Sequence, residues 1–239
     1  MLEASALSDK GCVRANNEDY SQIEPEMGLY VLADGMGGAK AGERASRMAV
    51  ETVYERILTA ASRDSEALLA AVQEANRRVL EAASGDPSLE GMGTTLVVAL
   101  EVGEELCIAS VGDSRAYLLD QSGLRAITED QSWVNEVGRP LGLNEEVLRT
   151  HPMRHVLTMA IGAGAPLEIK YYAIKLQPHN MVLMCSDGLH GVVDLGHIET
   201  ILRNGEPHQP LEQKCRELID AARAAGGPDN ITAVLLRAA

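Results

Sequence analysis

The sequence of 239 residues contains no phenylalanine and a single tryptophan, and aromatic residues make up only 3% of it. Leu, Val, Ile, Ala and Met must therefore fill the core, and the hydrophobic content of 46% is ordinary for a globular protein. No apolar run approaches the roughly 18 residues that a membrane-spanning helix needs. We therefore expect a sizeable core and no membrane partner.

Basic residues are also scarce, because 21 Lys and Arg stand against 35 Asp and Glu, for a formal net charge of -14. Binding to the phosphate backbone of a nucleic acid requires a basic face, so nucleic acid is excluded as a partner. The acidity is compatible with a site that collects divalent cations.

The four cysteines, at positions 12, 107, 185 and 215, form no CxxC pair and indicate no disulfide framework. The first residues lack the basic stretch and apolar run of a signal peptide. These two absences predict a cytoplasmic protein.

The chain is long enough for one large domain or two small ones, and no Ser- or Pro-rich linker divides it. We therefore expect a single domain over residues 1–239. Helical and strand-like segments do not alternate one by one, which argues against a doubly wound parallel sheet. The expected fold class is α+β, with antiparallel sheets and helices packed outside them.

Hydrophobic periodicity and turn residues predict the individual elements. Helices are expected over 41–61, 64–83, 194–203 and 209–225. Three strands with short turns between them, 94–101, 105–111 and 115–119, predict an antiparallel meander. Further strands are expected at 3–8, 28–33, 168–176, 180–186 and 230–237, and residues 128–166 are expected to be irregular with short helical pieces.

Three apolar runs of the chain end in aspartate. Residues 29–33 precede Asp34, residues 106–112 precede Asp113, and residues 181–186 precede Asp187. Short apolar runs bounded by Gly and Asp are typical of buried strands. Three strands are therefore predicted to deliver a carboxylate each at the C-terminal end.

Further acidic positions accompany them, with Asp229 before the run 231–236 and Glu18-Asp19 near the N-terminus. Carboxylates gathered at strand ends repel one another unless a cation holds them. Oxygen ligands suit Mg²⁺ or Mn²⁺, and no His or Cys cluster at zinc spacing competes. Two such ions about 4 Å apart can activate a bridging water and hold a phosphoryl group. Arg14 is the best candidate to bind that phosphate.

Six short motifs follow one another along the chain. They are Ser8-Asp9-Lys10-Gly11 continuing through Arg14 to Asn17-Glu18-Asp19, Ala33-Asp34-Gly35-Met36-Gly37-Gly38, Gly93-Thr94-Thr95, Val111-Gly112-Asp113-Ser114-Arg115, Cys185-Ser186-Asp187-Gly188-Leu189, and Gly226-Gly227-Pro228-Asp229-Asn230-Ile231-Thr232. In this order the chain resembles the metal-dependent protein phosphatases, the PP2C or PPM family, in its bacterial form. Any one motif is weak alone, since Asp-Gly and Gly-Asp are common turns, but six in order are a strong signal.

The resemblance implies an α-β-β-α sandwich of two central antiparallel sheets flanked by helices. It also implies hydrolysis of phosphoserine and phosphothreonine by a metal-bridging hydroxide, without a phosphoenzyme. Asp34 would bridge two Mn²⁺ or Mg²⁺ ions, with the Gly35 carbonyl as a further ligand. Asp187 and Asp229 would hold the first ion, and Glu18 or Asp19 would reach the second directly or through water.

The resemblance further implies a third, weaker ion site formed by Asp113 with Asp187. Arg14 would bind the phosphate and would be catalytic together with Asp34. A flap segment is expected at about residues 130–165. Phosphorylated proteins would be the substrates, and a bacterial Ser/Thr kinase and the proteins it phosphorylates would be the partners.

The chain departs from the family pattern in three places. Met36 stands where some relatives have a histidine thought to protonate the leaving group, so a metal-bound water is the expected donor, with His155 a minor candidate. The usual Asp-His-Ser becomes Asp130-Gln131-Ser132, and the usual Leu-Thr-Arg-Ala-Leu-Gly becomes the sequence of residues 157–162. The last two changes lie around the flap segment, and they affect substrate choice and the third ion rather than the core metal site.

Two other functions stay open from the sequence. A catalytically weak relative would act as a signalling adaptor, although a pseudoenzyme would be free to lose the acidic set and Arg14, both of which are present. A hydrolase of small phosphoesters would use the same site, although an acidic surface beside a flap favours a protein substrate. Outside the site, Arg115 is expected to pair with a nearby carboxylate, and the histidines other than His155 are expected to lie on the surface.

Overall fold

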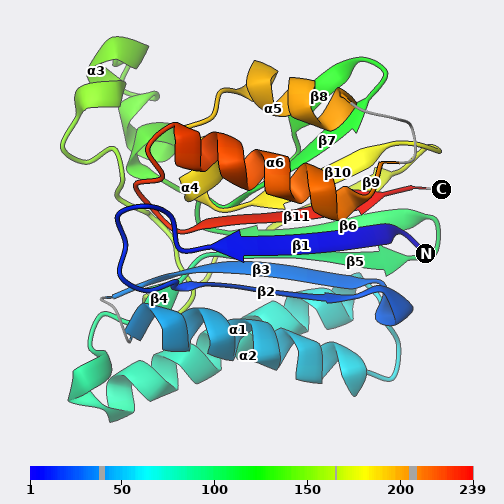
Figure 1. Ribbon diagram of the computed structural model, residues 1–239. Helices are drawn as coiled ribbons and strands as arrows, with labels where there is room; N and C mark the ends of the chain where they lie inside the picture. Colours follow the sequence, from blue (N-terminus) through cyan, green and yellow to red (C-terminus); the bar gives the residue numbers. More distant parts are fainter. Residues whose placement is uncertain (38–40, 165, 205–208, 239) are drawn as a thin grey trace.

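Two antiparallel β-sheets pack face to face in the computed structural model, and helices cover the outer face of each sheet (Figure 1). The structure describes residues 1–37, 41–164, 166–204 and 209–238. These four layers confirm the expected α-β-β-α sandwich. Gly38 of the second motif lies outside the described residues.

The first sheet contains five strands, all antiparallel to their neighbours. In spatial order they are β1 (Glu3–Asp9), β11 (Ile231–Arg237), β10 (Met181–Cys185), β7 (Arg115–Asp120) and β8 (Gly123–Ala126). β10 is buried along its whole length, since it pairs on both sides and is covered on both faces. Its direction carries the chain straight to Asp187.

The second sheet faces the first and is built in the same way. In spatial order its strands are β2 (Asp19–Glu24), β3 (Leu29–Met36), β5 (Leu96–Val102), β6 (Glu105–Val111) and β9 (Lys170–Lys175), and the two-residue β4 (Gly93–Thr94) pairs with the end of β3. Inner-face side chains of both sheets form one buried cluster that includes Tyr30, Leu118 and Val234.

Two pairs of helices close the sandwich (Figure 1). Against the second sheet lie α1 (Ala41–Leu58) and α2 (Ser65–Gly85), and against the first lie α5 (Leu195–Arg203), α6 (Leu211–Ala224) and the single turn α4 (Asp187–His190). The short α3 (Glu145–Thr150) and a π-helical turn (Val134–Gly138) belong to the flap segment, and two 3-10 turns cover Pro25–Met27 and Pro87–Leu89. No helix of the described ranges is long and apolar enough to cross a membrane.

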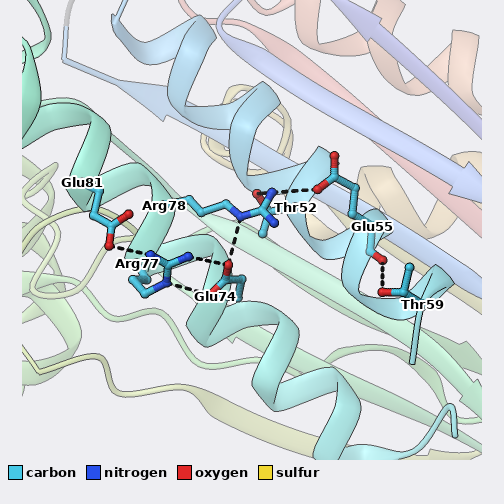
Figure 2. Close-up of polar contacts among 7 residues, drawn as sticks. All are labelled: Thr52, Glu55, Thr59, Glu74, Arg77, Arg78 and Glu81. Carbon is cyan, nitrogen blue, oxygen red and sulfur yellow. Dashed lines mark hydrogen bonds and ion pairs between the residues drawn. The ribbon is translucent and has the colours of Figure 1, made fainter. Parts of the chain in front are cut away.

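Charged side chains join the outer surfaces of α1 and α2 (Figure 2). Arg78 donates to Glu55 of α1 at 2.7 Å and to Glu74 of its own helix at 3.0 Å. Arg77 binds Glu74 through two nitrogens and also reaches Glu81. Such exposed pairs add little stability, so burial of the apolar helix faces holds these helices on the sheet.

The predicted meander is wrong at its second turn. β5 and β6 pair as expected, but β7 joins the other sheet, where its neighbours are β10 and β8. Gly112, at φ +97°, begins the turn, and a Cβ there would lie 2.8 Å from the Thr95 side chain. The crossing places Asp113 at the point where the chain passes from one sheet to the other.

Two strands, β2 and β8, and three helical turns, α4 and the two 3-10 turns, were not predicted. β2 is half-buried after Asp19 and shows no apolar alternation, and β8 has a single buried residue, Leu124. α4 is only four residues long, too short for a periodic signal. The remaining helices and strands confirm the predicted segments to within a few residues at each end, and residues 128–166 are mostly irregular as expected.

Candidate metal centre

Asp19 and Asp34 lie directly opposite each other on the paired strands β2 and β3. Residues opposite each other in an antiparallel pair present their side chains on the same face, so the two carboxylates are neighbours. Asp19 is buried, and its Oδ2 accepts hydrogen bonds from the hydroxyls of Ser186 at 2.8 Å and Thr232 at 2.6 Å. These bonds fix one side of the carboxylate and tie β2 to the first sheet.

The main chain around Asp34 is held on both sides. Its N–H donates to the Thr95 hydroxyl at 3.0 Å, and its carbonyl accepts from the Thr95 N–H at 2.8 Å. The N–H of Gly35 donates to the Glu18 carbonyl at 3.1 Å. A Cβ at Gly35 would lie 2.1 Å from the carbonyl oxygen of Gly42, so the first turn of α1 packs here only because the residue is glycine.

Asp187 and Asp229 come together because the loops that carry them are in contact. Asp187 begins α4 directly after β10, and Asp229 precedes β11, the neighbour of β10. A Cβ at Gly188 would lie 1.9 Å from the Asn230 carbonyl oxygen, which shows how closely the loops approach. Asp229 accepts a hydrogen bond from Arg14 at 2.7 Å.

Asn230 anchors the N-terminal loop to this cluster. Its Oδ1 accepts from the Glu18 N–H at 2.8 Å, and its Nδ2 donates to the carbonyls of Lys10 at 3.0 Å and Asn16 at 2.8 Å. The side chain is buried, at 5% exposure, so these three bonds replace hydration that the loop would otherwise need. Asn230 therefore positions the loop that carries Arg14 and Glu18.

Asp113 joins the cluster from the crossing turn between the sheets. Its carbonyl oxygen lies 3.0 Å from Nε2 of His190, which is half-buried rather than on the surface as the sequence predicted. Arg115 binds both carboxylate oxygens of Asp130 at 2.7 Å, which confirms its predicted structural pairing. The turn is thus held by α4 on one side and by the start of the flap segment on the other.

The cluster is electrostatically costly without a cation. Burial raises the pKa of Asp34 well above its usual range, and the charges of Asp19, Asp187, Asp113 and Asp229 raise it further. Burial likewise raises the pKa values of Asp19 and Asp113 to about 7, with Asp187 adding to both. These carboxylates therefore repel one another through a poorly solvated space.

The residues fit a hard divalent cation on two observations. The Oδ1 atoms of Asp19 and Asp187 are buried and receive no hydrogen bond from any residue the structure describes. Four other carboxylates, those of Asp19, Asp113, Asp187 and Asp229, lie close enough to raise the pKa of Asp34, and carboxylate oxygen is the donor type that Mg²⁺ and Mn²⁺ prefer. Buried acceptors without donors are stabilised when a cation enters.

The carboxylates do not form a closed coordination cage. Among the described residues, no group of three or more His, Cys, Asp or Glu side chains has the arrangement of a metal site. Burial and the charge of Asp229 raise the pKa of Asp187, and the neighbouring Asp34 lowers it. Oxygen sites also use carbonyls and water as ligands.

The structure brings the predicted carboxylates into one electrostatic cluster. Charge interactions link Asp34 with Asp19, Asp113, Asp187 and Asp229. Burial raises the pKa of Glu18, the nearby charge of Arg14 lowers it, and the charge of Asp229 raises it. The charge of His155 lowers the pKa of Asp187, so this histidine of the flap segment lies within electrostatic reach of the site.

Sequence reasoning missed the polar residues that support the cluster. They are Ser46, Thr95, Ser114, Ser186, Asn230 and Thr232. All but Ser46, which lies in α1, stand in one of the quoted motifs, but only tertiary contact shows which polar group each side chain meets. The signal that could have found those five is their position near Gly and Asp in these motifs.

The raised pKa values predict that the metal-free protein loses stability as the pH rises from about 4 to about 7. In that window the folded form keeps protons on Asp19 and Asp113 that the unfolded chain has released. Burial lowers the pKa of His190 to about 4, so this residue makes the stability rise with pH below about pH 6.5. The raised pKa of Asp34 acts in the same direction as those of Asp19 and Asp113, so the stability still falls as the pH rises.

Thermal denaturation in EDTA at pH 5 and pH 8 measures this effect. We expect the higher melting temperature at pH 5, and stabilisation by Mn²⁺ that is larger at pH 8, because metal and protons compete for the same oxygens. A melting temperature in EDTA that rises from pH 5 to pH 8 would contradict the like-charge cluster.

The chain is similar to known phosphatases over its whole length. The pattern of the family described as Protein phosphatase 2C matches residues 13–235. The Serine/threonine phosphatase stp of Listeria welshimeri is 36% identical, over 98% of this chain and 95% of the relative. The structure of the S. agalactiae serine/threonine phosphatase has a TM-score of 0.92 at 32% identity and covers 100% of both chains. The catalytic domain of the phosphatase PstP, solved in complex with 2 manganese ions, has a TM-score of 0.86 at 34% identity, over 99% of this chain and 97% of that domain.

Proposed function

This chain belongs to the protein phosphatase 2C family, and we propose that the carboxylate cluster around Asp34 is the metal centre at which it acts. The protein is a metal-dependent serine/threonine protein phosphatase. The buried Oδ1 atoms of Asp19 and Asp187, which lack donors among the described residues, carry this proposal.

The proposed ligands are those expected from the sequence. Asp34 and the carbonyl of Gly35 would hold the metal together with the other carboxylates, because Asp34 interacts with four of them, Asp19, Asp113, Asp187 and Asp229. Asp187 and Asp229 serve one ion, and Glu18 or Asp19 serves the other. Asp113 with Asp187 forms a third and weaker site, since Asp113 lies on the crossing turn at the edge of the cluster. The proposed metal is Mn²⁺ or Mg²⁺.

The chain's own residues prepare the site for a phosphomonoester. When bound, divalent cations supply positive charge to the phosphoryl oxygens and lower the pKa of water. Arg14 is exposed and already pairs with Asp229, and a guanidinium has enough N–H donors to hold that carboxylate and a phosphate oxygen together. Arg14 therefore orients the phosphate, while Asp229 orients Arg14.

The proposed substrates are phosphoserine and phosphothreonine in proteins, including a Ser/Thr kinase and the proteins that this kinase phosphorylates. The exposed position of Arg14 supports this, because a phosphate carried on a protein chain can reach it. The absence of a disulfide framework in the sequence supports a place in the cytosol.

Hydrolysis of a phosphothreonine peptide tests the function. We expect turnover with Mn²⁺, loss of turnover in EDTA, and recovery when Mn²⁺ is added back. The matched control is Glu74→Gln, in the ion-pair cluster on the outer surface of α2, which should leave turnover unchanged. A well-folded protein with no turnover in Mn²⁺ or Mg²⁺ would favour the adaptor, and turnover of small phosphoesters alone would favour the small-molecule hydrolase.

Arg14→Lys should raise KM for a phosphopeptide more than it lowers kcat. Lysine keeps the charge but loses the planar fork that holds Asp229 and phosphate together. A charged hydrogen bond is worth about 1.5–3 kcal/mol, so kcat/KM should fall about 10- to 100-fold. Steady-state kinetics with Mn²⁺ at saturation measures the split. An unchanged KM would show that Arg14 does not bind the phosphate.

A further inference from the structure

Gln131 lies where the flap segment leaves the first sheet, and the hydrogen bonds of its side chain and main chain join parts of the chain that are distant in sequence. Its Oε1 accepts from the Gly112 N–H at 2.9 Å, and its Nε2 donates to the Glu168 carbonyl at 2.9 Å. Its main-chain N–H donates to the Gly112 carbonyl at 2.9 Å, and its own carbonyl accepts from the Thr158 N–H at 3.0 Å. The residue is 1% exposed, so these bonds form away from solvent.

The two legs of the flap segment pair beside Gln131 in a short neck. Trp133 donates its N–H to the Val156 carbonyl at 2.8 Å, and Ser132 forms a β-bridge with Leu157. With the bond from Thr158, the outgoing leg, 131–133, and the returning leg, 156–158, form one small antiparallel ladder. We call residues 131–133 and 156–158 the flap neck, and Gln131 stands at its base.

The turn that carries Asp113 is fixed at three main-chain groups. Gln131 holds both the N–H and the carbonyl of Gly112, and the Nε2 of His190 lies 3.0 Å from the carbonyl of Asp113. A side chain at Gly112 would meet Thr95, because a Cβ there would lie 2.8 Å from the Thr95 side chain. A shift of the main chain that carries the Asp113 carboxylate must therefore break a bond to Gln131 or to His190.

We propose that Gln131 is a positioning residue that couples the flap neck to Asp113, so that displacement of the neck and displacement of this carboxylate are one event. The inference rests on the proposed function, in which Asp113 belongs to the weaker cation site. A cation held by Asp113 then stabilises the neck, and opening of the neck weakens that cation. The flap segment and the third site regulate each other through one buried amide.

Glutamine suits this position because it offers an acceptor and a donor at once. Gly112 presents an N–H and Glu168 presents a carbonyl, so the bridging side chain must accept on one side and donate on the other. The amide does this at every pH, whereas the histidine that the family pattern places here does so only as a neutral ring.

Hydrogen exchange followed by mass spectrometry, with and without Mn²⁺, tests the coupling in the full chain. In the unsubstituted protein, Mn²⁺ should slow exchange both at the 110–114 turn and at the flap neck. In Gln131→Met, which keeps the side-chain length and the main-chain bonds to Gly112 and Thr158 but removes both side-chain bonds, Mn²⁺ should slow exchange at the neck clearly less than in the unsubstituted protein. The dissociation constant of the weakest Mn²⁺ should rise about 10-fold or more, as is usual when a residue supporting a metal ligand is lost, and the tighter ions should bind as before.

Two further variants make the test decisive. Asn180→Leu removes another buried amide, which accepts from the Gln177 N–H at the opposite end of β10, and it should preserve the Mn²⁺ effect at the neck. Asp113→Asn, in a chain that keeps Gln131, should abolish that effect and gives the answer even when Gln131→Met does not fold. Gln131→His should retain the effect at pH 8.

The outcomes separate this inference from the proposed function. Slowing of exchange at the neck by Mn²⁺ in Gln131→Met or in Asp113→Asn, equal to that in the unsubstituted protein, would overturn the coupling while leaving the metal centre intact. No Mn²⁺ binding by the unsubstituted protein would overturn the proposed function itself. An unchanged dissociation constant of the weakest Mn²⁺ in Gln131→Met would show that the residue only stabilises the fold.

Discussion

Asp34→Asn is expected to remove nearly all phosphatase activity and to raise the melting temperature of the protein in EDTA. The activity falls because the shared ligand of the proposed metal pair loses its charge. Metal ions contribute several kcal/mol to stabilising such transition states, so the loss should be about 10³-fold or more. The metal-free protein gains stability because folding no longer has to bury an ionisable carboxyl in a cluster in which burial and four other carboxylates raise the pKa of Asp34.

Phosphopeptide turnover and thermal denaturation measure the two effects of Asp34→Asn on one sample. Mn²⁺ should raise the melting temperature of the unsubstituted protein much more than that of the variant. Asp64→Asn is the control, since Asp64 caps α2 at the surface by accepting from the Ala67 N–H, and its loss should leave turnover and the response to Mn²⁺ unchanged. Full turnover in Asp34→Asn would remove Asp34 from the metal centre.

Asn230→Ala should lower both stability and activity, although Asn230 is not a proposed ligand. The substitution leaves the Glu18 N–H and the carbonyls of Lys10 and Asn16 without the buried amide that binds them. Unsatisfied buried groups cost about 1–3 kcal/mol each, and partial hydration of the loop leaves a net loss of roughly 2–4 kcal/mol. For a chain of this size that lowers the melting temperature by roughly 5–15 °C.

The activity of Asn230→Ala should fall about 10- to 100-fold, because Arg14 and Glu18 lose their common support. Asn230→Asp is the matched variant, since it keeps an acceptor for the Glu18 N–H but cannot donate to the two carbonyls. Its stability should be no higher than that of Asn230→Ala, because the new carboxylate faces two carbonyl oxygens and lies beside a cluster of like charges. Circular dichroism melts and phosphopeptide kinetics measure the changes, and normal activity in Asn230→Ala would show that the loop is held by other contacts.

The positions of the carboxylates were largely predictable because strand ends are well marked in this sequence. The buried run before Asp34 and the run before Asp187 both end at Asp-Gly, where the strand signal stops abruptly. Asp229 was predictable from the start of a strand instead of its end, since it stands just before the apolar run 231–236. The local sequence pattern is sufficient to predict such a carboxylate when a short apolar run between turn residues can form only a buried strand.

The sheet to which a strand belongs was not predictable in the same way. β5, β6 and β7 have the spacing of a meander, yet β7 lies in the opposite sheet. A short turn suits a hairpin and a crossing equally well, and the choice depends on how the inner faces of the two sheets pack. The contact of Gly112 with Thr95 and the bond from Gln131 are consequences of that choice.

The supporting polar residues show a second limit of sequence reasoning. Asn230 meets residues more than 200 positions away in the chain, and Thr232 meets Asp19 at a similar separation. His190 follows an apolar segment and was predicted to lie on the surface, but it packs against the main chain of Asp113. Local pattern identifies which residues carry charge, while tertiary contact decides which polar groups hold them.

The most direct test of the proposed metal centre is a crystal structure of this protein grown with Mn²⁺, in which anomalous scattering locates the ions. We predict two strong peaks that share Asp34, one of them also bound by Asp187 and Asp229, and a weaker peak at Asp113. Strong peaks elsewhere on the acidic surface, with none at Asp34 and Asp187, would contradict the assignment.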